Sequence, residues 1–154
     1  MSLPYDVITF DCYGTLIDWE RGIRDAFAAV AAAIRRPVNL DAALALYVET
    51  EAQVEAEPYR AYREVLRETA TRIAARLEWR LPESRAGFLA ESMPAWPPFP
   101  DTNRGLVRLD QAGYRLHWCK GHYFRCRKAL PLDRLWQAYE FVHAIVAAAG
   151  AAGP

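Results

Sequence analysis

A single carboxylate near the start of the chain is the first residue that could do chemistry. The segment 5–10 is rich in β-branched and aromatic residues, which is typical of a short buried strand, and Asp11 directly follows it. Gly14 then gives the backbone the freedom of a tight turn, and an amphipathic helix is predicted from about Trp19. A carboxylate at the carboxyl end of the first strand of an α/β sheet lies where such folds bind ligands. The alternative is a structural role in which Asp11 accepts hydrogen bonds from turn amides.

The residues from Phe10 to Leu16, Phe-Asp-Cys-Tyr-Gly-Thr-Leu, resemble the first motif of the haloacid dehalogenase superfamily. In that superfamily the leading Asp is the nucleophile. Most members, the phosphatases, carry a second Asp two positions later, and both carboxylates help to hold magnesium. Here that position is Tyr13. Since a phenol has a pKa near ~10, it is a poor magnesium ligand and a poor proton shuttle at neutral pH. The Tyr form resembles the type II 2-haloacid dehalogenase branch, which needs no metal.

Two later segments extend this resemblance over residues 5 to 116. They are 58–66, Pro-Tyr-Arg-Ala-Tyr-Arg-Glu-Val-Leu, and 96–102, Trp-Pro-Pro-Phe-Pro-Asp-Thr. The resemblance implies an α/β fold with an incomplete Rossmann-like parallel-sheet core and an inserted α-helical cap. We expect residues 1–17 and 97–154 to form the core and residues 18–96 to form the cap.

The pattern of apolar residues predicts the same order of elements. Spacings of three and four residues predict helices over 19–35, from Leu40 to about Glu55, from about Pro58 to Leu77, and around Glu83 to Glu91. Pro58 suits the first turn of its helix. Four prolines between 94 and 100 cannot continue a helix. Asp101 or Thr102 is expected to cap the next helix, Gly113 to end it, and a strand to begin at Tyr114. This order is expected if a helical cap is inserted after the first strand of a parallel sheet.

The composition is that of an ordinary globular protein. The chain has 154 residues, of which 53% are apolar and 25% charged, and its net charge is zero. Nothing in this balance favours nucleic acid or a membrane surface as a partner, and no apolar run is long enough to span a bilayer. Without the pattern of a signal peptide, we expect a cytoplasmic protein with free thiols and a small-molecule substrate.

Amino-acid usage changes abruptly near Leu116. All three histidines, both lysines and two of the three cysteines lie beyond it, and no acidic residue occurs between Asp110 and Asp133. In the superfamily this region holds a strand that ends in a Ser or Thr, which binds the anionic group of the substrate. The aligned position is Lys120. The later lysine and the closing acidic motif of the superfamily have no recognisable counterpart.

Three interpretations of this tail stay open. The side chains of His117, Cys119, His122 and Cys126 could bind a metal, although their spacing matches no familiar zinc pattern. The basic run with its aromatic residues could bind nucleic acid, although it is short and isolated. The third interpretation, favoured by the missing motifs, is a truncated, frame-altered or degenerate end.

The cap also departs from the superfamily. Haloacid dehalogenases carry an arginine on an early cap helix, where it helps to receive the halide. The nearest stretch here, 47–51, contains no arginine, and carboxylates continue through Glu55 and Glu57. We expect most of these glutamates to form a solvated face. An acidic segment near the site would disfavour a carboxylate substrate.

The resemblance therefore implies a hydrolase that cleaves the carbon–halogen bond of a small 2-haloacid through an aspartyl ester on Asp11. Thr15 and the amides of the Gly14 turn would orient Asp11, Tyr13 would shape the pocket, and Lys120 would supply positive charge. No metal or cofactor is expected. The alternatives are a catalytically inactive remnant or interaction module, and a phosphatase. The missing motifs of the second half predict weak or no activity, because they would supply much of the charge around the reacting carboxylate. An incomplete sheet with an unpaired edge predicts marginal stability, and self-association or a homodimer.

Overall fold

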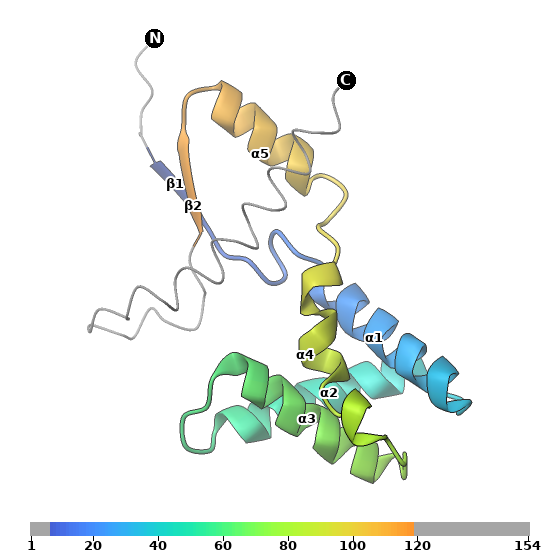
Figure 1. Cartoon of the computed structure of the whole chain (residues 1–154). Coiled ribbons are helices and arrows are strands. Elements are labelled where there is room, and N and C mark those ends of the chain that lie inside the picture. Colours follow the sequence, from blue (N-terminus) through green and yellow to red (C-terminus); the bar gives the residue numbers. More distant parts are fainter. Residues whose placement is uncertain (1–6, 119–154) are drawn as a thin grey trace. The chain divides into compact units, whose positions relative to one another are not determined.

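The computed structural model describes residues 7–118 of the chain, and these form two compact units. The first unit combines residues 7–18 with residues 97–118. The second unit is the continuous segment Trp19–Trp96 (Figure 1). The chain therefore leaves the first unit after Asp18 and returns to it at Pro97.

A parallel pair of strands lies at the centre of the first unit. Strand β1 (Val7–Phe10) pairs with β2 (Arg115–Trp118), in a register that joins Val7 to Arg115 and Phe10 to Trp118. Helix α5 (Thr102–Gln111) precedes β2 (Figure 1). The predicted fold class, α/β with an incomplete parallel sheet, is confirmed by this pairing within the described residues. The first strand is less buried than expected, since Val7 is 39% exposed and Ile8 is only partly buried.

The end of α5 follows the sequence prediction. Gly113 adopts a φ of 90°, which favours glycine, and its amide donates to the Asp110 carbonyl at 2.9 Å. The next amide, that of Tyr114, reaches back to the Leu109 carbonyl at 3.2 Å. These two bonds form a Schellman motif, which ends the helix and sends the chain into β2.

The start of α5 differs from the prediction of a side-chain cap. Asp101 occupies the N-cap position with helical backbone angles, and its side chain makes no capping bond. The Thr102 hydroxyl does not cap either, because it donates to the carbonyl of Leu16 at 2.9 Å. The expected capping role is therefore wrong for both residues.

Helices make up the second unit: α1 (Trp19–Ile34), α2 (Leu40–Glu55), α3 (Tyr62–Arg76) and α4 (Phe88–Ser92), with single 3₁₀ turns at Glu83–Arg85 and Met93–Ala95. The predicted apolar face of α1 is confirmed, since Ile23 and Phe27 are fully buried. The Phe27 ring lies 6.2 Å from the Trp79 ring and 5.3 Å from the Phe88 ring, centroid to centroid. Aromatic contacts of this kind join the helices around one apolar core.

One predicted helix start is wrong, and one predicted helix is broken in two. Helix α3 begins at Tyr62 rather than Pro58, because Ala61 is extended and its amide donates to the Glu64 carboxylate at 3.3 Å. This bond is the glutamate half of a capping box, and it fixes the start of the helix. The segment predicted as one helix around 83–91 is broken in two, with Gly87, a poor helix former, preceding α4.

No helix within residues 7–118 combines the length and the apolar character needed to cross a membrane.

Candidate functional site

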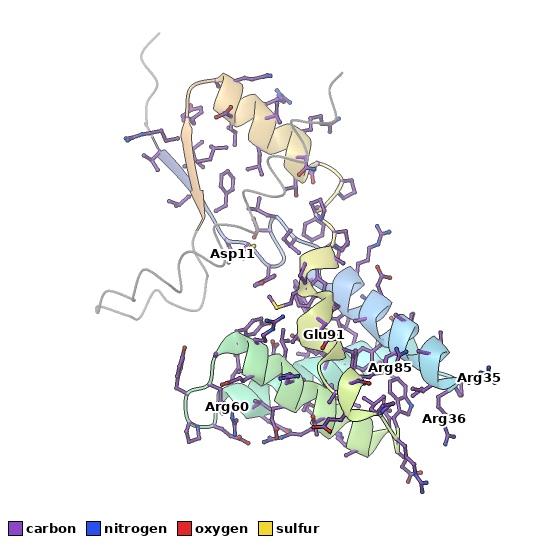
Figure 2. All side chains as sticks on the ribbon, viewed as in Figure 1. Asp11, Arg35, Arg36, Arg60, Arg85 and Glu91 are labelled. Carbon is purple, nitrogen blue, oxygen red and sulfur yellow. The ribbon has the colours of Figure 1, made fainter. Side chains whose placement is uncertain are left out.

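The carboxylate of Asp11 stands directly after β1, at the carboxyl end of a parallel strand (Figure 2). The side chain is exposed, and the Thr15 hydroxyl donates to its Oδ2 atom at 3.2 Å. Since ligands bind at the carboxyl ends of strands in parallel α/β sheets, this is the edge at which a substrate would meet Asp11.

In the loop that follows Asp11, several backbone amides donate to the same carbonyl oxygen, that of Cys12. Cys12 is buried, and its carbonyl oxygen accepts the amides of Leu16 at 2.8 Å and Ile17 at 3.0 Å. Gly14 adopts a φ of 84°, and its amide donates to the Ile17 carbonyl at 2.9 Å. A side chain at position 14 would be strained at this φ, so the compact turn requires glycine.

These bonds give the Gly14 turn a structural role. The amides from Gly14 to Ile17 donate to carbonyls of the loop itself, and the orienting of Asp11 by amides of this turn stays a prediction. Gly14 therefore acts by shaping the loop, while Thr15 contacts Asp11 directly. Tyr13 is partly buried and forms a β-bridge with Ile17. The remaining predicted site residue, Lys120, lies outside the described residues, as do Cys119, His122 and Cys126.

The far side of this loop is held by the proline-rich segment. Ile17 is fully buried and forms an antiparallel bridge with Pro98. The amide of Phe99 donates to the Leu16 carbonyl at 3.2 Å, and the Thr102 hydroxyl donates to the same oxygen at 2.9 Å. Sequence reasoning missed this role of Thr102, because a threonine before a helix is normally taken as a cap. The proline run beside it was the available signal that the two segments meet.

Solved structures that align with this chain include L-2-haloacid dehalogenases. The enzyme from Xanthobacter autotrophicus aligns with a TM-score of 0.64 at 20% identity, over 96% of this chain and 53% of that chain. The same enzyme with chloropropionic acid covalently bound aligns at 0.61 and 19%, over 94% and 52%. A defluorinating L-2-haloacid dehalogenase aligns at 0.62 and 22%, over 71% and 48%. The chain has the fold of the L-2-haloacid dehalogenases.

This result confirms the predicted resemblance at the level of the fold. The chain spans about half the length of these dehalogenases. No family model matches the sequence, and no curated protein matches it.

The helix on which the resemblance to dehalogenases places a halide-receiving arginine carries a different group here. Tyr47 is 1% exposed and donates through its hydroxyl to Glu51 Oε1 at 2.6 Å, and Tyr62 donates to the same oxygen at 2.8 Å. Burial raises the pKa of Tyr47 above its ordinary value of 10, and the nearby Tyr62 and Glu51 raise it further. Tyr47 therefore stays protonated and donates at neutral pH.

The expectation of a solvated acidic face is wrong for Glu51 and Glu57. Glu51 is half-buried between the two phenols, and Glu57 accepts a hydrogen bond from Arg60 and forms an ion pair with Arg72, each at 2.7 Å. These carboxylates join α2 and its following loop to α3. They bind partners within the helical unit, although the Glu57 side chain is still one-third exposed.

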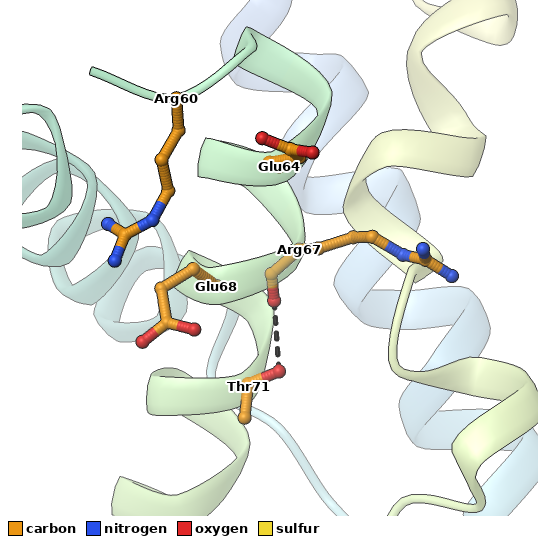
Figure 3. A pocket seen from close by; sticks show the side chains of 5 residues that line it. All are labelled: Arg60, Glu64, Arg67, Glu68 and Thr71. Carbon is orange, nitrogen blue, oxygen red and sulfur yellow. Dashed lines mark hydrogen bonds between the residues drawn. The ribbon is translucent and has the colours of Figure 1, made fainter. Parts of the chain in front are cut away.

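An open pocket of about 270 Å³ lies along α3 and the segment just before it (Figure 3). Its residues are far in the sequence from the ends of β1 and β2. It is lined by Arg60, Glu64, Arg67, Glu68 and Thr71. Arg60 and Glu68 are held in ion pairs, and the Thr71 hydroxyl donates to the Arg67 carbonyl at 3.0 Å. Two carboxylates offset its two guanidinium groups, so the pocket has no net charge to attract a carboxylate substrate.

No group of three His, Cys, Asp or Glu side chains within the described part of the chain could hold a metal ion.

Proposed function

We propose that the chain is a hydrolase of the haloacid dehalogenase type that releases halide from a small 2-haloacid. The observation that carries the proposal is the Asp11 carboxylate at the carboxyl end of β1, contacted by the Thr15 hydroxyl. The fold adds support, because a solved enzyme with the same fold holds chloropropionic acid covalently. A covalent adduct is what attack by a carboxylate nucleophile would leave.

In the proposed reaction an oxygen of ionised Asp11 attacks the sp³ carbon that carries the halogen. The carbon–halogen bond breaks, the halide leaves with the electron pair, and an aspartyl ester forms. Water then attacks the carbonyl carbon of Asp11, and the bond between that carbon and the ester oxygen breaks. The products are the 2-hydroxyacid and the regenerated carboxylate, with release of one proton. One oxygen of the water thus enters Asp11.

Three other residues take supporting roles in this proposal. Thr15 holds the attacking carboxylate in one orientation through its hydroxyl. Tyr13 occupies the position of the second carboxylate of the phosphatases and shapes the pocket without offering a ligand for magnesium. Lys120 supplies positive charge toward the substrate carboxylate.

The test is halide release from 2-chloropropionate by the wild-type chain and by Asp11→Asn. The amide keeps the shape of the side chain and removes its nucleophilic charge, so release should stop while the melting temperature stays the same. Asp101→Asn is the matched control, because Asp101 is an exposed carboxylate of the same unit that makes no capping bond. Release by Asp11→Asn at the wild-type rate would contradict the proposal.

Two further arms of this experiment separate the alternatives. EDTA should leave halide release unchanged, whereas a phosphatase would lose activity on p-nitrophenyl phosphate in EDTA and regain it with magnesium. A folded wild-type chain that releases no halide and no phosphate would favour the inactive interaction module.

A further inference from the structure

One backbone oxygen accepts two hydrogen bonds, one from the proline-rich segment 96–100 and one from the first residue of α5. The carbonyl of Leu16 accepts the Phe99 amide at 3.2 Å and the Thr102 hydroxyl at 2.9 Å. Thr102 is only 7% exposed, and the two ends of its bond are 86 positions apart in the sequence. A bond of this kind costs much to lose, because the carbonyl would be left with fewer donors in a buried place.

Leu16 directly follows the residue that contacts Asp11. The turn closes on the Cys12 carbonyl, and Thr15 within this turn donates to Asp11. The Leu16 carbonyl is where Thr102 fixes this turn to the first turn of α5. The Phe99 amide and the Ile17–Pro98 bridge hold the same side of the loop, and the Thr102 hydroxyl adds a side-chain bond to them. The position of the loop that carries the Thr15 hydroxyl depends on these bonds together.

We propose that Thr102 is a positioning residue for Asp11. Resting on the proposed function, the inference is that the hydroxyl of Thr102 holds the loop in the orientation from which Asp11 attacks. Helix capping does not account for Thr102, because its hydroxyl bonds to Leu16 and not to the first amides of α5. Its position explains why a threonine stands where the proline-rich segment turns into the helix.

The test compares Thr102→Val, Thr102→Ser and Thr69→Val in the full chain. Valine keeps the shape of threonine and removes the hydroxyl, while serine keeps the hydroxyl. Thr69 is the matched control, because it is fully buried and its hydroxyl has no hydrogen-bond partner in the described part of the chain. Its exchange for valine should leave turnover unchanged and the melting temperature equal or higher.

For Thr102→Val we expect kcat for 2-chloropropionate to fall on the order of 10- to 100-fold, with KM within about twofold. Thr102→Ser should restore most of the turnover. Hydrogen exchange gives a second readout that needs no activity: the amides of Leu16 and Ile17, which bond to Cys12, should lose protection in Thr102→Val. Amides in the middle of α3 should keep theirs.

Wild-type kcat and wild-type protection of Leu16 and Ile17 in Thr102→Val would overturn the inference. So would loss of turnover in Thr102→Ser equal to that in Thr102→Val, since the hydroxyl would then be irrelevant. If Thr102→Val does not fold, Thr102→Ser decides: wild-type protection of the two amides supports the inference, and lost protection overturns it. If the wild-type chain releases no halide, the proposed function fails, and the exchange data still test whether Thr102 holds the loop.

Discussion

The proposed reaction depends on one exposed carboxylate, that of Asp11, and on the hydroxyl of Thr15 four positions later. Asp11 follows a strand, and Thr15 lies in a turn that requires a positive φ at Gly14, so the local sequence brings the two side chains together. A nucleophile needs such a neighbour, because a freely rotating carboxylate spends little time in an attack geometry. The Thr15 hydroxyl limits that rotation.

At this scale we predict that Thr15→Val lowers kcat on the order of 10- to 100-fold, because Asp11 loses the donor that orients it. The unfolding free energy should change by less than about 0.5 kcal/mol, because Thr15 is exposed. Halide release and urea denaturation measure the two effects. Thr71→Val is the control, since it removes an exposed hydroxyl that donates to Arg67 on α3. Equal kcat values for Thr15→Val and the wild type would exclude the orienting role.

Among the elements, α2 and α3 are joined by carboxylates that have partners. Glu57 lies between Arg72 and Arg60, and Arg72 also pairs with Glu68 at 2.7 Å. Hydrogen bonds from Arg72 and then Arg60 lower the pKa of Glu57 from 4.5 to about 2. The side chain is one-third exposed, so solvent screens part of this interaction.

The lowered pKa of Glu57 predicts how the stability of the helical unit depends on pH. A depressed carboxylate stabilises the fold above its unfolded pKa of about 4.5, and this contribution is lost as pH falls toward 2. Glu57→Gln should therefore melt below the wild type at pH 7, and the two melting temperatures should converge near pH 2. Glu83→Gln, an exposed carboxylate in a 3₁₀ turn, should match the wild type at both values. A difference for Glu57→Gln that does not vary with pH would contradict the assignment.

Close packing between α1 and the end of the helical unit gives a second prediction for the elements. A Cβ atom on Gly22 would lie 2.5 Å from Trp96 Cδ1, and the indole is held by a 2.9 Å bond from its Nε1 to Ser92 Oγ. Gly22→Ala should therefore destabilise the chain by about 1–3 kcal/mol.

At Gly105 the same substitution, glycine to alanine, is expected to stabilise the chain instead of destabilising it. A Cβ atom there meets nothing within 4 Å, and Gly105 lies inside α5. Gly105→Ala should stabilise the chain by about 0.5–1 kcal/mol, since alanine favours the helix. Urea denaturation of both variants checks the pair. Equal effects of the two substitutions would show that Trp96 does not pack as described.

At the scale of the molecule, motifs confined to one segment were predicted well. The Asp11 motif, the apolar face of α1 and the end of α5 at Gly113 each depend on neighbours within a few positions, so local sequence determines them. The parallel pairing of β1 with β2 followed from the order of the elements, and the comparison with solved dehalogenases confirms the fold.

Features that depend on distant partners were missed. The Thr102 hydroxyl could cap a helix or bond elsewhere, and only the folded chain brings the Leu16 carbonyl to it. Glu51 looked like a solvated carboxylate because the phenols of Tyr47 and Tyr62 come from two different helices. In each case the polar atom had a local and a distant option, and tertiary packing decided between them.

The most direct test of the central claim is a single turnover in ¹⁸O water. The chain, in excess over 2-chloropropionate, would be digested afterwards, and the peptide that contains Asp11 would be analysed by mass spectrometry. If Asp11 forms the ester, ¹⁸O enters its carboxylate, and the hydroxyl of the product stays unlabelled in the first turnover. Label in the product hydroxyl, with none in the Asp11 peptide, would mean that water attacks the substrate directly and would contradict the account.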